Sequence, residues 1–141
     1  MIENLCPILS WNVRGLNSPA RRAAVAEIVV CHRLGILCLQ ETKISTGTTD
    51  LAREVGGAKL RDCVVLPALD TRGGAAIFWD PDVVEITSHA IGQFAITAQA
   101  RLKASGKSFW LTTVYGPTDD ERKEDFLTEI RSSAPKLDNL G

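Results

Sequence analysis

A strand–helix–strand pattern at the start of the chain limits the folds that it can adopt. Residues 7–13 form a short apolar run that predicts a buried strand, and Ser18-Pro19 favours a helix start. Gly35 predicts the end of that helix, and residues 36–39 predict a second buried strand. Such a unit favours two parallel strands joined by a crossover helix, so we expect an α/β fold. The expected core-facing stripe of the helix comprises Ala20, Ala24, Ile28, Cys31 and Leu34.

The rest of the chain predicts mainly antiparallel strands and one further helix. Residues 94–102 alternate between apolar and polar, and a turn at 104–107 leads into a strand over 109–115, which together indicate a hairpin. Residues 118–121 form a capping box for a last helix, whose inward-facing residues are expected to be Phe126, Leu127 and Ile130. Further strands are expected at 63–67, 75–79 and 83–87.

The composition predicts one globular domain over residues 1–141. With 45% hydrophobic and 23% charged residues, the chain is close to the average for globular proteins, which excludes disorder as its main state. A net charge of −1 excludes a strongly basic coat protein for nucleic acid, but not an enzyme with a local basic rim. Since no apolar run approaches the ~20 residues of a membrane span and no signal peptide is evident, we expect an intracellular protein. The four cysteines lack a zinc-binding spacing and are expected to be reduced.

Polar side chains lie at the ends of three of the predicted buried strands. They are Asn12, Glu41 and Tyr115, which offer an amide, a carboxylate and a phenol. If the strands are neighbours, these groups converge at one rim, where a carboxylate with waters and substrate phosphate oxygens could hold Mg²⁺. That set indicates chemistry on a phosphodiester. Each residue also has a structural interpretation: a loop-forming asparagine, a solvated glutamate and a tyrosine at the edge of the core.

Four short blocks of sequence carry a resemblance to a known family. The blocks are residues 9–18 (LSWNVRGLNS), 39–43 (LQETK), 72–77 (RGGAAI) and 114–117 (VYGP). In this order they resemble the endonuclease/exonuclease/phosphatase superfamily. Their sequences are most similar to the endonuclease of plant non-LTR (LINE-type) retrotransposons, and the resemblance covers about Pro7 to Ile130.

The resemblance implies a role for each matching residue. Glu41 matches the Mg²⁺-binding glutamate, Asn12 the asparagine that helps to hold the metal, and Tyr115 the tyrosine that contacts the scissile phosphate. Lys43 matches a basic position beside the glutamate, and Arg14 replaces an acid of the apurinic-site repair branch, which favours the retroelement assignment. Arg72 is either a DNA-backbone contact or part of a tight glycine turn. DNA is the implied partner, and the nucleus is the implied location.

The resemblance also implies that this chain is the N-terminal half of a four-layered α/β sandwich. The family's Gly-Asp-Phe-Asn block and its closing Ser-Asp-His block have no counterpart here. We therefore expect a truncated domain, a mixed sheet with flanking helices, that is inactive alone because a general base is worth about 10²–10⁴ in rate. A complementary C-terminal half or a reverse transcriptase region is the expected partner, and an apolar face left uncovered is expected to make the product prone to association.

Three alternatives remain open from the sequence. The chain could be a non-catalytic relic or interaction module of the same fold. It could also be a phosphatase-type member that acts on phosphorylated small molecules. A nucleotide-binding α/β module ranks last, because the loop after the first strand, residues 12–18, carries a single glycine.

Overall fold

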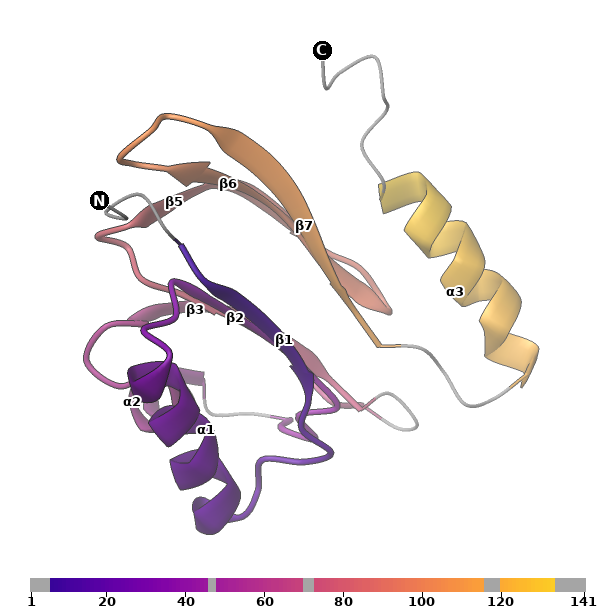
Figure 1. Ribbon diagram of the computed structural model, residues 1–141. Coiled ribbons are helices and arrows are strands. Elements are labelled where there is room, and N and C mark those ends of the chain that lie inside the picture. The colour runs from indigo at the N-terminus through magenta and orange to yellow at the C-terminus, as the bar shows by residue number, and fades with distance from the viewer. Residues whose placement is uncertain (1–5, 46–47, 70–72, 116–119, 134–141) are drawn as a thin grey trace.

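The computed structural model describes residues 6–45, 48–69, 73–115 and 120–133 (Figure 1). Across the molecule, two helices, a first β-sheet, a second β-sheet and a third helix follow one another. The α/β fold expected from the sequence is confirmed. In the described part of the chain, no helix is long and apolar enough to cross a membrane.

The first sheet is mixed and has four strands in the order β1-β2-β4-β3. Strands β1 and β2 are parallel, which confirms the expected strand–helix–strand unit, whereas β4 is antiparallel to both β2 and β3. The bounds are β1 (Ile8–Asn12), β2 (Ile36–Gln40), β3 (Asp62–Leu66) and β4 (Ala75–Trp79). Strand β1 therefore lies at one edge of this sheet.

The second sheet is antiparallel, with the order β5-β6-β7. The expected hairpin is present, because β6 pairs with β7 from Ala95↔Val114 to Arg101↔Ser108. The bounds are β5 (Val84–Ile91), β6 (Ala95–Leu102) and β7 (Ser108–Val114).

Alternation along the central strands builds two separate cores. Leu37 and Leu39 of β2 face the helices, α1 (Pro19–Cys31) and α2 (Thr48–Gly56), which cover one face of the first sheet. Ile36 and Cys38 face the second sheet instead. Because both faces of β2 are covered, its sequence is a nearly continuous run of apolar residues.

Helix α1 differs from its expected orientation and end. Val25 and Val29 are its buried residues, whereas Ala20, Ala24 and Cys31 are exposed. The helix ends at Cys31, and Arg33 takes the left-handed conformation (φ +50°) that closes it. Gly35 instead leaves space for Cys6, because a Cβ at position 35 would lie 2.5 Å from the Sγ of Cys6.

Helix α2 has no counterpart in the sequence prediction. Its buried residues, Leu51, Ala52 and Val55, follow the spacing of a helix face, and they pack in the core beneath the first sheet. The signal was therefore present in the sequence.

Helix α3 (Asp120–Ser133) packs against the residues that lead into β6. The Phe126 ring meets Phe94 edge-on at 5.8 Å, and the Glu129 carboxylate accepts hydrogen bonds from the N–H groups of Gln93 (2.5 Å) and Phe94 (2.6 Å). Ile130 is half-buried, but Leu127 is 47% exposed, so its expected inward position is wrong. Part of the expected capping box, residues 118–119, lies outside the described residues.

Candidate functional site

The loops that follow β1 and β2 run side by side at one end of the first sheet. Asn12 is the register partner of Gln40 in the two parallel strands. The pairing continues beyond them, since Gly15 N–H donates to Glu41 O (2.6 Å) and Leu16 N–H donates to Thr42 O (2.8 Å). This ladder places the candidate residues of the first loop next to those of the second.

Three charged residues of these loops have left-handed backbones. The φ angles are +55° at Arg14, +55° at Glu41 and +58° at Lys43. Outside glycine, this conformation costs roughly 1–2 kcal/mol per residue. It persists where surrounding hydrogen bonds fix it, and such residues cluster at functional sites.

Glu41 and Tyr115 come together around Gly73. A Cβ built on Gly73 would lie 3.1 Å from Cε1 of Tyr115 and 3.4 Å from Cα and Cγ of Glu41, so both side chains border one point. Tyr115 is 6% exposed, and its N–H donates to Phe94 O (2.7 Å). Glu41 is half-buried. The carboxylate-bearing loop and the phenol thus meet, although 74 positions of sequence separate residues 41 and 115.

Asn12 shapes the first loop. Its side chain is exposed, and its Oδ1 accepts a hydrogen bond from Arg14 N–H at 3.2 Å. An amide oxygen has two lone pairs, so this turn leaves Oδ1 able to accept one further partner.

A basic rim borders Glu41. Arg14 and Lys43 are exposed, and the Lys43 chain passes Gly15, where a Cβ would lie 3.7 Å from its Cδ. Arg21 of α1 donates from Nη1 to the carbonyls of Val13 (2.5 Å) and Arg14 (3.2 Å), which fixes the loop. The sequence prediction did not include Arg21. Arg72 lies outside the described residues.

Two residues hold the second loop: Thr42, whose role the sequence did not predict, and Gly74, which belongs to the glycine turn expected at residues 72–74. Thr42 is fully buried, and its N–H and that of Lys43 donate to the carbonyls of Gly74 (3.4 Å) and Gly73 (2.6 Å). Gly74 has a φ of +85°, and a Cβ there would lie 2.8 Å from Thr42 Oγ1, so both backbone and space require glycine. The adjacent glycines in the sequence were the available signal.

The donor chemistry of the site fits Mg²⁺. Glu41 supplies a carboxylate and Asn12 an amide oxygen, and Mg²⁺ commonly takes one or two carboxylates with waters and substrate oxygens. Among the residues that the structure describes, no group of three or more His, Cys, Asp or Glu side chains could hold a metal. The site would therefore depend on water and phosphate to complete the coordination.

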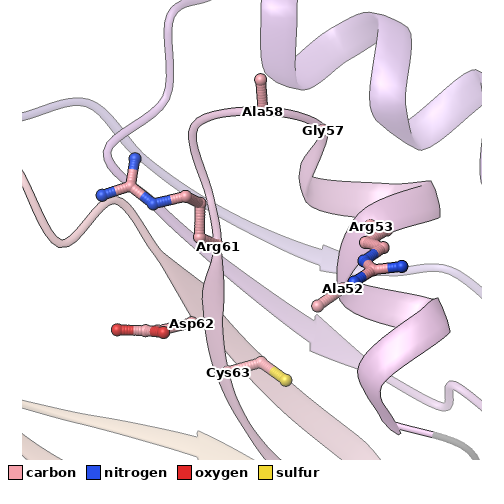
Figure 2. A pocket seen from close by; sticks show the side chains of 7 residues that line it. All are labelled: Ala52, Arg53, Gly57, Ala58, Arg61, Asp62 and Cys63. Carbon is pink, nitrogen blue, oxygen red and sulfur yellow. The ribbon is translucent and has the colours of Figure 1, made fainter.

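A separate pocket of about 500 Å³ lies at the other end of the first sheet, beside the start of β3 (Figure 2). Arg61 at its rim pairs with Asp82 through two hydrogen bonds of 3.0 and 3.4 Å. Burial, with a contribution from Asp62, raises the pKa of the Cys63 thiol, which makes it a poor nucleophile. This pocket does not contain the residues that the sequence singled out.

Comparison with known families covers most of the chain. The model of the Endonuclease/Exonuclease/phosphatase family matches residues 9–133. The chain belongs to this family. The match includes Asn12, Arg14, Glu41, Lys43, Arg72 and Tyr115.

Solved structures of this fold include DNA-processing proteins. D. rerio TDP2 complexed with single strand DNA product is 18% identical, with a TM-score of 0.62 over 89% of this chain and 51% of that chain. The AP endonuclease LMAP from Leishmania major is 19% identical, with a TM-score of 0.59 over 94% and 45%. The Xenopus laevis APE2 catalytic domain is 22% identical, with a TM-score of 0.56 over 86% and 48%.

The chain thus spans about half the length of these structures. No curated protein matches the sequence significantly. Family membership supports a phosphodiesterase or nuclease type of domain, and the low identities to solved structures establish the fold alone.

Proposed function

We propose that this chain is the N-terminal part of a Mg²⁺-dependent DNA endonuclease domain of the LINE retrotransposon type. The observation that carries the proposal is the meeting of Glu41 and Tyr115 around Gly73, beside the strand end that bears Asn12. A half-buried carboxylate, a phenol and an amide at one end of a sheet form a set suited to a phosphodiester.

Each residue has a distinct task in this proposal. Glu41 and Asn12 would hold the ion, which would neutralise charge that develops on the phosphate. Tyr115 contacts the scissile phosphate at the wall of the site. The exposed side chains of Arg14 and Lys43 attract the neighbouring phosphates of the strand.

The retroelement assignment rests on the amino-acid sequence of residues 12–18 and on Arg14 in place of an acid. It implies a nuclear protein whose full activity requires a complementary C-terminal half or a reverse transcriptase region. The chain spans about half of the solved structures that it resembles, so we expect metal and DNA binding but no useful turnover from this chain alone.

The test is a titration of the ¹⁵N-labelled protein with Mn²⁺, a paramagnetic ion that prefers similar oxygen ligands. We expect selective broadening of the amide signals of Asn12, Glu41 and Gly73. Glu41→Gln keeps the size of the side chain and should weaken Mn²⁺ binding by more than about tenfold, since even outer partners of a metal are worth that much. Glu27→Gln, on the exposed face of α1, is the matched control.

Substrate class is read in the same spectra after Mg²⁺ is added. A short DNA strand should shift the signals of Arg14, Lys43 and Tyr115, whereas inositol phosphate should not. Broadening that Glu41→Gln leaves unchanged would refute the metal site, and shifts caused by inositol phosphate alone would favour the phosphatase alternative.

A further inference from the structure

Gly73 fills the gap between the two side chains of the proposed site. A Cβ at this position would lie 3.1 Å from the Tyr115 ring and 3.4 Å from Glu41 Cγ. Both values are shorter than the 3.5–4.0 Å, roughly, at which carbon atoms attract each other best. The contact with Glu41 would be an ordinary one, whereas the contact with Tyr115 would be tight enough to move the ring by a few tenths of an ångström.

The backbone itself does not require glycine at position 73. Its φ lies outside the left-handed region, in contrast to Gly74 at +85°. Chain geometry accounts for Gly74, but only the approach of Glu41 and Tyr115 accounts for the lack of a side chain at Gly73.

Hydrogen bonds fix the backbone around Gly73. The Glu41 carbonyl accepts the 2.6 Å hydrogen bond from Gly15, and the Gly73 carbonyl accepts one of the same length from Lys43. Tyr115 is 6% exposed and held through its N–H by Phe94. A methyl group on Gly73 would therefore push the Tyr115 ring away from Glu41 by a few tenths of an ångström rather than move the surrounding backbone.

We propose that Gly73 is a positioning residue, which sets the separation between the Glu41 side chain and the Tyr115 ring. The functional meaning of that separation rests on the proposed function, in which the two side chains act on one phosphate group. The separation itself is a property of the folded chain, so it can be tested without metal or substrate.

Tyr115 offers a specific probe, because the sequence contains one tyrosine. Labelling tyrosine with ¹³C at the ring ε positions gives signals from Tyr115 alone. Glu41→Gln removes a charge beside the ring and should shift these signals. When Gly73→Ala is also present, the shift caused by Glu41→Gln should be measurably smaller, because the ring then lies further from Glu41.

Gly57→Asn is the control, since Gly57 has a φ of +65° and open space around it, and asparagine tolerates that backbone. It should leave the response of Tyr115 to Glu41→Gln unchanged. A response that is equally large with and without Gly73→Ala would overturn the proposal.

A second measurement uses the unmodified chain and remains valid if Gly73→Ala fails to fold. A nuclear Overhauser cross-peak is expected between the ring ε protons of Tyr115 and the α protons of Gly73. Its absence overturns the proposal. Neither the Tyr115 shift nor the cross-peak involves Mn²⁺ or DNA. Failure of metal binding would therefore refute the proposed function, and the two NMR measurements would still decide the role of Gly73.

Discussion

Burial keeps three of the cysteine thiols in their protonated form. Cys38 is buried, Cys6 and Cys63 are partly buried, and this desolvation raises the pKa of each thiol above its usual value. Since the thiolate is the reactive species, these three residues are poor nucleophiles near neutral pH. Cys31, in contrast, is exposed on α1.

We therefore expect iodoacetamide near neutral pH to modify Cys31 well before the other three cysteines. Mass spectrometry of proteolytic fragments over a time course measures each rate. Raising the pH should accelerate alkylation of Cys6 and Cys63, because a larger fraction of a thiol with a raised pKa then ionises. Equal rates at Cys31 and Cys63 at neutral pH would contradict this account.

At the scale of residues, the sequence indicates the candidate side chains but not what arranges them. Asn12, Glu41 and Tyr115 stand out because each lies at the end of an apolar strand. The roles of Thr42 and Gly73 arise from contacts with residues that are distant in the chain, and no local pattern encodes such contacts.

At the scale of elements, α3 is held by a small number of contacts. The Glu129 carboxylate fixes the N–H groups of Gln93 and Phe94, and the Phe94 carbonyl in turn holds Tyr115. Phe94 therefore links α3 to Tyr115, which borders the proposed site.

Glu129→Gln should loosen this attachment, because an amide accepts hydrogen bonds more weakly than a carboxylate does. We expect a loss of about 1.5 kcal/mol in the free energy of unfolding and faster hydrogen exchange at the amides of Gln93 and Phe94. Thermal unfolding and exchange measured by NMR check the two effects. Glu124→Gln, exposed on the same helix, should change neither. Unchanged exchange in Glu129→Gln would show that the Glu129 carboxylate does not hold the amides of Gln93 and Phe94.

Helix α1 shows why its orientation could not be predicted from the sequence. It carries two apolar stripes with helical spacing, one of alanines and one containing Val25 and Val29. Val25 and Val29 face the core, while Ala20 and Ala24 line a groove of about 440 Å³ beside β1. Only the position of the sheet decides between the two stripes.

At the scale of the whole molecule, the first sheet ends in an edge strand, β1. Strand β1 pairs with β2 on one side, and in the described part of the chain no strand pairs with its other side. Its sequence, ILSWN, has no charge, and Ile8 is 48% exposed. Natural edge strands are usually protected by charge, proline or a covering segment, so this edge favours pairing with another chain.

We expect the isolated chain to associate as its concentration rises, as measured by light scattering after size-exclusion chromatography. Ile8→Lys should lower the apparent mass at high concentration by placing a charge on the edge. Val30→Lys is the matched control, because Val30 is 70% exposed on α1, away from β1. Equal suppression by both variants would indicate a general effect of charge rather than pairing at β1.

The overall architecture was accessible from the sequence only in part. The alternation over residues 7–43 predicts the parallel β1–β2 pair, and turn residues predict the β6–β7 hairpin. The strand order β1-β2-β4-β3 depends on pairing between distant segments, which local patterns do not specify. The four-layered arrangement was implied by the family resemblance and not by periodicity.

The left-handed backbones of Arg14, Glu41 and Lys43 have a consequence for engineering. Glycine or asparagine adopts this conformation at lower cost, so a search that scored heat resistance alone would favour replacing these residues. Such a search would yield a more heat-stable protein that lacks the charged side chains of the proposed site. Any stabilised version should therefore keep these positions fixed and seek its gains elsewhere.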